Sequence, residues 1–333
     1  MFMFSSILFF FMLILSTMIC ISSNSWLGAW IGLEINLLSF IPMMSNKKNS
    51  LSNESSLKYF LIQAFASILL LFFICLNFFI KNFFFTIYFN EYYLILLNSS
   101  LLLKLGAAPF HFWFPSVMEG LNWINNLILM TWQKINPLVC LTYCLNSNFF
   151  YITAMFSVIL GSLGGLNNIS IRKVIAYSSI THMGWMLISM TSNEMSLWFY
   201  FFIYSFISFS LILNFNQLKL FYFNQFLNNS ISSLNKMFIM MMFLSMGGLP
   251  PFLGFFPKWI VIESMINSNL LIYCLIMVIM TLLTLFFYLR MSFSLFVMNN
   301  FQMYWNKKMN LNQFFLYWNL FSLIFPMLLM FMI

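Results

Sequence analysis

The chain has 333 residues, of which 62% are hydrophobic and 6% are charged, and its formal net charge is +8. Soluble domains carry about 25% charged residues, so this composition excludes a water-soluble fold and favours an all-α, polytopic transmembrane helix bundle. The basic residues are scattered singly or in pairs between apolar spans rather than gathered in one patch, which argues against binding of nucleic acid.

Apolar runs of about 20 residues predict about eleven membrane spans. The first begins almost at Met1, so we expect a retained helix rather than a cleaved signal. We expect breaks in the fourth and ninth spans and no break in the fifth. The whole chain is expected to form one membrane domain, with repeat halves at roughly 1–145 and 149–298. The expected spans are 3–21, 25–44, 58–80, 91–113, 122–145, 149–168, 171–191, 195–218, 236–265, 270–298 and 312–332.

The connectors between these spans carry their basic residues on alternate sides. The positive-inside rule therefore places the N-terminus on the basic side, which is the matrix in a mitochondrion. The composition, with 46 Phe and 28 Met, is typical of an AT-rich coding genome such as an animal mitochondrial one. One side holds Lys47, Lys48, Lys58, Arg172, Lys173, Lys219, Lys236, Lys307 and Lys308, and the other holds Lys81.

Two stretches that share one sequence pattern interrupt the apolar runs. "GAAPFHFWFP" at 106–115 and "GLPPFLGFFP" at 248–257 both fit G-x-x-P-F-x-x-x-F-P and hold five of the eight prolines. Paired interruptions in two halves of a membrane chain are typical of internal repeats, each with a broken helix beside a polar cavity. The residues that define the breaks are Gly106, Pro109, Pro115, Gly248, Pro251 and Pro257.

Four charged residues lie inside spans or against a break: Glu34, Lys104, Lys134 and Lys258. A charge near the centre of a bilayer costs at least about 2.5–3.5 kcal/mol, so such groups face the bundle interior, pair, or change protonation. One acid and three lysines suit a proton relay. Two alternatives stay open: Lys104 or Lys258 could extend to an interface, and Glu34 could be only the structural partner of a lysine.

The two histidines and five cysteines add little further chemistry. His182 lies inside the seventh span, either as a hydrogen-bonded core residue or as a member of the relay. His111 lies in the first break and is expected at its aqueous edge. The cysteines lie in apolar spans without a C-x-x-C pair, which predicts core-filling residues and no metal or iron–sulfur site.

Five stretches resemble the antiporter-like, proton-translocating membrane subunits of mitochondrial NADH:ubiquinone oxidoreductase, respiratory complex I. The similarity runs in order from about residue 24 to residue 260, and the composition is similar to that of the insect versions. After residue 265 only the hydropathy is similar. The stretches are "SNSWLGAWIGLEINLLSFIP", "LLLKLGAAPFHFWFP", "LMTWQKINP", "KVIAYSSITHMGWM" and "GGLPPFLGFFPKW".

The resemblance implies roles for single residues. Glu34 matches a glutamate that pairs with a broken-helix lysine, and Lys104 matches that lysine. Lys134 matches the central lysine of the next helix, Lys258 the polar position beside the second break, and His182 a histidine on the polar axis. Full-sized relatives have about three more N-terminal helices, which leaves open what seals that flank.

The resemblance also implies a setting in the inner mitochondrial membrane. No cofactor is expected in this chain, because flavin and iron–sulfur clusters would belong to other subunits that oxidise NADH and reduce ubiquinone. The expected partners are membrane lipids and other complex I subunits, especially neighbouring antiporter-like and small membrane-arm subunits.

Two other functions remain possible on the residues alone. A stand-alone secondary cation/proton antiporter would have the same repeats and buried charges. A haem-carrying quinone enzyme would need the two histidines as ligands. Co-purification with other subunits and an absorption spectrum would separate these functions from a complex I subunit.

Overall fold

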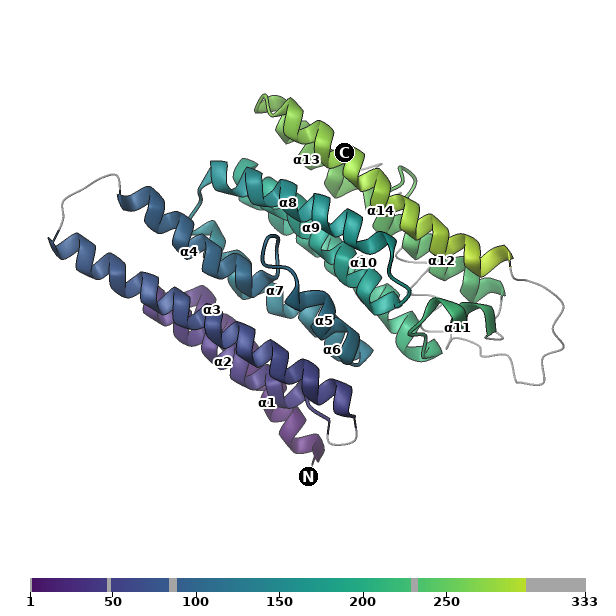
Figure 1. Ribbon diagram of the computed structural model, residues 1–333, viewed down its shortest axis with the longest axis horizontal. Coiled ribbons are helices and arrows are strands. Elements are labelled where there is room, and N and C mark those ends of the chain that lie inside the picture. Colours follow the sequence, from purple (N-terminus) through teal and green to yellow (C-terminus); the bar gives the residue numbers. More distant parts are fainter. Residues whose placement is uncertain (1, 47–48, 84–88, 229–232, 298–333) are drawn as a thin grey trace. The chain divides into compact units, whose positions relative to one another are not determined.

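The computed structural model describes residues 2–46, 49–83, 89–228 and 233–297, and this part of the chain is built from α-helices (Figure 1). The predicted eleventh span, 312–332, lies outside the described residues. The helices are α1 (Phe2–Ser22), α2 (Trp26–Met44), α3 (Ser50–Phe83), α4 (Phe89–Leu105), α5 (Trp113–Gly120), α6 (Trp123–Met130), α7 (Trp132–Thr142), α8 (Ser147–Leu166), α9 (Ile171–Ser192), α10 (Glu194–Leu218), α11 (Phe223–Asn228), α12 (Ser233–Gly247), α13 (Phe255–Asn267) and α14 (Leu271–Val297).

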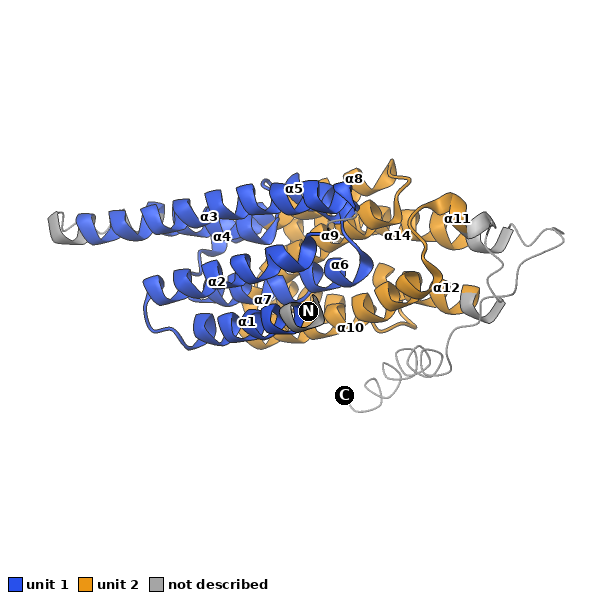
Figure 2. Cartoon of the chain, turned by 90° about the horizontal axis from the view of Figure 1, so that it is seen from below, with its two compact units in different colours: residues 1–153 blue, residues 154–333 orange. Residues whose placement is uncertain are grey.

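The chain divides into two compact units, residues 1–153 and 154–333 (Figure 2). In unit 1, α1 packs along α2, α2 along α3, and α3 along both α4 and α5, while α7 contacts α1, α2 and α4. In unit 2, α9 packs against α10, α13 and α14, and α12 lies between α10 and α14. Helix α7 thus has neighbours on several sides in unit 1, as α9 has in unit 2.

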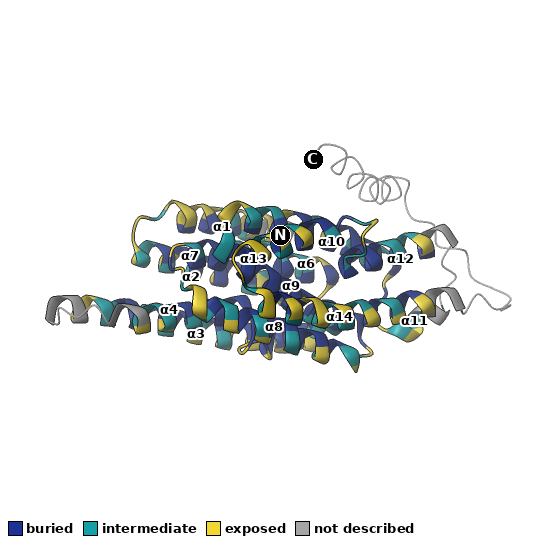
Figure 3. Ribbon diagram, turned by 90° about the horizontal axis from the view of Figure 1, so that it is seen from above, coloured by how far each residue is buried: buried dark blue, intermediate teal, exposed yellow. Residues whose placement is uncertain are grey.

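Five of the described helices are long and apolar enough to cross a membrane: α2, α3, α8, α10 and α14. Many of their exposed residues are large and apolar, and Figure 3 shows exposed positions along α14. Leu271, Leu275, Ile279, Leu282 and Phe286 recur every three or four residues on its exposed side, which is one face of a helix. Such a face suits lipid or an apolar neighbour rather than water.

The fourth predicted span is broken after α4. The N–H of Gly106 donates to the carbonyl of Leu103 at 3.3 Å, and that of Ala107 to Leu102 at 3.2 Å. This pair of bonds is a Schellman motif, which needs a left-handed residue, and Gly106 has φ +71°. The absence of a Cβ makes this conformation inexpensive, so the glycine fixes where α4 ends.

The ninth predicted span is broken in the same way after α12. Gly248 has φ +80°, its N–H donates to Ser245 at 3.1 Å, and the N–H of Leu249 donates to Leu244 at 3.4 Å. Four residues beyond each glycine the chain turns again, with Phe110 bonded to Ala107 and Phe252 bonded to Leu249, both at 2.9 Å. The two breaks therefore share the turn that ends the helix and the turn that follows it, although the Ala108–Pro109 peptide of the first break is cis.

Both breaks are shorter than the motif that announces them. Pro109 and Pro251 lie between the helices, but Pro115 and Pro257 lie in the first turns of α5 and α13. The first N–H groups of a helix have no partner within it, so a proline costs no hydrogen bond there. The sequence predicted Pro115 and Pro257 inside the breaks, whereas both lie in the helices that follow them.

Candidate functional site

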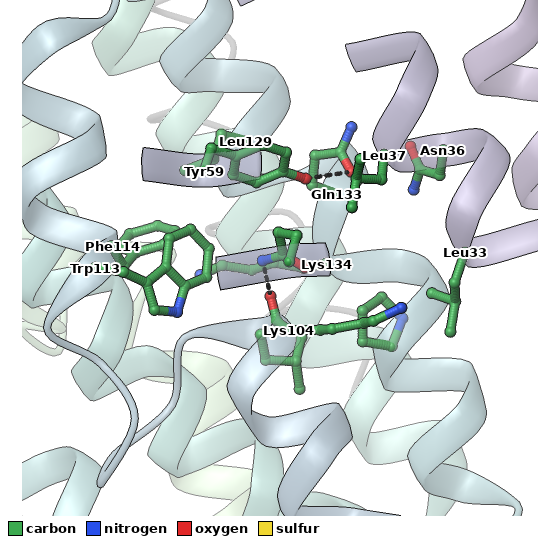
Figure 4. Close-up of a pocket in the computed structure, with 13 residues that line it drawn as sticks. Leu33, Asn36, Leu37, Tyr59, Lys104, Trp113, Phe114, Leu129, Gln133 and Lys134 are labelled. Carbon is green, nitrogen blue, oxygen red and sulfur yellow. Dashed lines mark hydrogen bonds between the residues drawn. The ribbon is translucent and has the colours of Figure 1, made fainter. Parts of the chain in front are cut away.

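A small cavity in unit 1 is lined by side chains from α2 to α7 (Figure 4). The space open to the centre of a water-sized sphere is about 20 Å³, enough to hold an ordered water molecule. A polar cavity in an apolar bundle is a place where a charge can be solvated. Its polar lining residues are Asn36, Tyr59, Gln63, Lys104, Gln133 and Lys134.

Lys134 reaches this cavity from α7 and is only 2% exposed. Its ammonium lies 5.2 Å from the centre of the Phe114 ring of α5, toward which it points in Figure 4. An aromatic face attracts a cation electrostatically, and the attraction grows when water is excluded. The position deep in the bundle agrees with the expectation that this lysine faces a polar interior.

The helix that carries Lys134 is interrupted beside it, contrary to the prediction of an unbroken fifth span. Helix α6 ends at Met130 and α7 begins at Trp132. The hydroxyl of Thr131 donates to the carbonyl of Leu127 at 2.7 Å, and such back-bonding bends helices. Pro137, one turn further, has no N–H to give to the carbonyl of Gln133. The backbone on both sides of Lys134 is therefore irregular.

Lys104 lies in the last turn of α4, is 7% exposed, and lines the same cavity. A cation in the last turn of a helix is stabilised by the partial negative charge of its carbonyls. The carbonyls of this turn have donors of their own: Gln63 of α3 donates to the Lys104 carbonyl at 3.1 Å, and the Trp113 indole donates to Leu103 at 3.0 Å. The ammonium itself points toward Leu33 of α2 in Figure 4.

Glu34 lies on α2, one residue after Leu33, and is half-buried. Among the charged side chains near Lys104, the Glu34 carboxylate attracts its ammonium most strongly. The two groups nevertheless form no ion pair within 4.0 Å. The direct ion pair expected from the sequence is thus a longer-range attraction here, one that a water molecule could bridge.

Four neutral polar residues of the cavity, Asn36, Tyr59, Gln63 and Gln133, were not singled out from the sequence. Tyr59 donates to Gln133 at 3.4 Å, and Gln63 holds α4 as described. The Oδ1 of Asn36 and the Nε2 of Gln133 are buried without a hydrogen-bond partner among the described residues. Buried polar atoms of this kind are usually satisfied by water. The available signal was an uncharged polar residue inside an apolar span, which the search for charges passed over.

In unit 2, Lys258 of α13 is 7% exposed and reaches back across the second break. Its ammonium donates to the carbonyl of Gly247, the last residue of α12, at 2.9 Å. A Cβ placed on Gly248 would lie 2.8 Å from that ammonium nitrogen, so a side chain there would displace the lysine head, and the φ of +80° itself favours glycine. Lys258 therefore caps the broken helix directly.

His182 of α9 lies in a buried cluster of aromatic hydroxyls. Its Nδ1 is 2.9 Å from the Tyr200 hydroxyl, and its ring centre is 5.1 Å from that of Tyr204, both on α10. Tyr288 of α14 lies beside Gly247, whose carbonyl accepts the hydrogen bond from Lys258. The buried Tyr288 hydroxyl has no hydrogen bond of good geometry among the described residues. Sequence reasoning found the histidine but not the tyrosines, because tyrosine is common in this chain.

The remaining candidates stay apart from these sites. His111 is buried in the first break rather than exposed at an aqueous edge, and its ring stacks beside Phe112 with ring centres 4.3 Å apart. Among the residues that the structure describes, no group of three or more His, Cys, Asp or Glu could hold a metal ion. The groups available for chemistry at the sites described above are lysine ammonium, histidine imidazole, hydroxyl and amide groups.

Residues 23–284 match the family described as NADH:quinone oxidoreductase/Mrp antiporter, transmembrane. Among curated proteins, NADH-ubiquinone oxidoreductase chain 2 of Anopheles gambiae is 57% identical over 312 residues, which cover 92% of this chain and 91% of that one. The protein of the same name in Mus musculus is 41% identical over 301 residues, covering 86% and 84%.

Solved structures give the same fold. Respiratory complex I from Thermus thermophilus contains a chain that matches 98% of this one, over 78% of its own length, with a TM-score of 0.85 at 21% identity. A chain of the Mrp complex from Dietzia matches 84% of this one, over 58% of its own length, with a TM-score of 0.73 at 15% identity.

Proposed function

We propose that this chain, which belongs to the NADH:quinone oxidoreductase/Mrp antiporter family, moves protons through the polar interiors of its two units by way of Glu34, Lys104, Lys134, Lys258 and His182. The chain is a multi-pass membrane subunit of NADH:ubiquinone oxidoreductase, respiratory complex I. What carries the proposal is the placement of two buried lysines, Lys104 and Lys134, on one cavity with room for water.

The chemistry follows from the environment of each lysine. A buried ammonium is costly, so its proton is held only while nearby groups compensate for the lost water. Around Lys104 the compensation comes from the end of α4 and from Glu34, and around Lys134 from the Phe114 ring. A change in water content or in a neighbouring charge therefore shifts the balance, and the proton passes between lysines through the cavity.

Unit 2 supports a second group of the same kind. Lys258 holds the end of α12, and the Tyr200 hydroxyl holds the orientation of His182. The matching turns at Gly106 and Gly248 support two inverted repeats, each with a broken helix. An experimental structure in which the two repeats fail to superpose after a rotation would contradict that part.

In this proposal, other subunits hold the flavin and iron–sulfur clusters, oxidise NADH and reduce ubiquinone. These reactions supply the free energy for proton movement in this chain. Neighbouring antiporter-like and small membrane-arm subunits and lipids would contact this chain. Similarity to NADH-ubiquinone oxidoreductase chain 2 favours this role over the stand-alone cation/proton antiporter that the residues alone leave open. Purification of the tagged chain from mitochondria tests it, because isolation without other subunits would contradict membership of the complex.

For orientation we propose an N-terminus in the matrix of the mitochondrion, supported by the uneven distribution of basic connectors. A cysteine placed at Asn49, between α2 and α3, should react with an impermeant thiol reagent only from the matrix side. Labelling from the intermembrane space would reverse the orientation.

The central test replaces Lys134. Lys134→Met keeps the length of the side chain but cannot hold a proton, and Lys134→Arg stays charged at any accessible pH. Both variants should assemble, and both should lose most NADH:quinone turnover together with proton uptake in reconstituted vesicles. Lys58→Met is the control, because Lys58 is exposed and pairs only with Glu54 one turn away. Normal turnover and a normal proton-to-electron ratio in both Lys134 variants would show that this lysine is structural.

A further inference from the structure

We propose that Cys20 of α1 and Cys140 of α7 form an oxidisable dithiol, which hydrogen peroxide converts into a disulfide that ties α1 to α7. The two sulfur atoms are 3.6 Å apart and are 120 positions apart in the sequence. Both thiols are free and fully buried. The two thiols are not members of the proton path proposed above, although they lie near Lys104, and they join α1 to α7, which pack against each other.

The position of the pair is fixed by close helix packing. A Cβ on Gly32 of α2 would lie 2.8 Å from the Cβ of Cys20, so α2 holds α1 tightly at this level. A disulfide bond is about 2.05 Å long, so the sulfurs need to approach by only about 1.5 Å. We expect rotation about the Cα–Cβ bonds or a small helix shift to supply that distance.

The pair is also close to a route for a small oxidant. Cys20 is two residues from the end of α1, and Cys140 is two residues from the end of α7. The connectors that follow, at Asn24 and Tyr143, are exposed. Hydrogen peroxide is small and uncharged, so it can reach thiols that a bulky reagent cannot.

A positive charge lies nearby. The Lys104 ammonium interacts electrostatically with both sulfur positions. The thiolate is the form of a cysteine that attacks peroxide and disulfide sulfur. Cys144, the third cysteine of this region, differs because its thiol donates to the Oδ1 of Asn98 at 2.8 Å and to the carbonyl of Cys140 at 3.2 Å.

The reaction balances in two steps. One thiolate attacks peroxide, the O–O bond breaks, and a sulfenic acid and one water form. The second thiol then displaces the hydroxyl group from the sulfenic sulfur, which gives the S–S bond and a second water. Two thiols are oxidised and one peroxide is reduced, and a dithiol reductant reverses the change.

The test uses the intact complex in membrane vesicles. After treatment with hydrogen peroxide, the remaining thiols are alkylated under denaturing conditions, and the peptides are analysed by mass spectrometry. We expect a linked peptide that contains Cys20 and Cys140, increases with peroxide, and disappears after dithiothreitol. Cys75 of α3 is the internal control, because it is partly exposed and should be oxidised or alkylated singly.

Two variants sharpen the result. Cys140→Ser should abolish the linked peptide and leave Cys20 available for alkylation. Gly32→Ala should lower the linked yield several-fold, because the added methyl group displaces α1 at Cys20. The proposal is overturned if Cys20 and Cys140 remain separately alkylated in the unmodified complex at peroxide concentrations that oxidise Cys75.

Discussion

The break after α4 and the break after α12 begin with the same glycine turn, but different side chains satisfy their carbonyls. After α4, the donors are neutral: the Gln63 amide and the Trp113 indole. After α12, the donor is the ammonium of Lys258. The first break thus leaves the head of its lysine directed to a cavity, whereas the second uses its lysine to hold the helix end.

The comparison shows that one sequence motif can place a lysine either in the helix that ends at the break or in the helix that begins after it. Lys104 precedes its glycine by two residues and belongs to the helix that ends. Lys258 follows its glycine by ten residues and returns from the helix that begins. A lysine in the first position can change protonation without loosening the break, whereas in the second position protonation and helix capping are linked.

Replacing the two lysines should separate these roles, with the largest effect at Lys258. Lys258→Met leaves the buried Gly247 carbonyl without its donor, which costs about 1–3 kcal/mol. We expect a lower melting temperature and less assembled complex on native gels. Lys104→Met should assemble normally and lose coupled turnover. Equal assembly of both variants would mean that the cap contributes little.

Substitution of the two glycines should give a smaller difference in melting temperature, again with the larger loss at the second break. Gly106→Ala and Gly248→Ala both force a side chain into a left-handed conformation, which costs about 1–2 kcal/mol. At Gly106 the new Cβ would lie 3.1 Å from Phe114 and Trp113, whereas at Gly248 it would lie 2.8 Å from the Lys258 ammonium nitrogen and displace the donor that caps Gly247. We expect Gly248→Ala to have the lower melting temperature of the two. The reverse order would place the greater strain at the first break.

The smallest effect is expected at the neutral cap of α4. Gln63→Leu removes the amide that donates to the Lys104 carbonyl, at a cost of about 1 kcal/mol. The complex should assemble, and turnover should fall moderately because Lys104 is held less firmly at the cavity. Phe65→Leu, an exposed position on the same helix, is the control. No change in turnover would show that the Trp113 bond alone fixes the end of α4.

Several features of the fold could be read from the sequence because the residues involved are scarce. Glycine and proline are rare here, so the two matching stretches indicate where helices end, and the structure ends α4 and α12 at those glycines. The resemblance to the complex I subunit family, stated from five stretches, is confirmed by the match over residues 23–284. Scarce charges likewise indicated Lys104, Lys134 and Lys258, which are all buried.

Other features could not be predicted from a single sequence. The interruption at Thr131 depends on a hydroxyl that bonds to its own helix, and threonine does this without a distinctive pattern. The neutral lining of the cavity, such as Tyr59 and Gln63, depends on which helix faces meet. The distance between Glu34 and Lys104 depends on the same packing, so the sequence indicated attraction but not the absence of direct contact.

The length of α3 has a consequence for the thickness of the surrounding bilayer. Its 34 residues span about 51 Å, whereas a hydrocarbon core is about 30 Å thick. The exposed Glu54–Lys58 pair lies in its polar first turns and marks the part that extends beyond the hydrocarbon. In a thinner bilayer the apolar remainder must tilt. Gln63 lies on this helix and donates to the Lys104 carbonyl at the end of α4. Tilting of α3 would therefore strain that hydrogen bond, so the length of the lipid acyl chains should affect the geometry of the site.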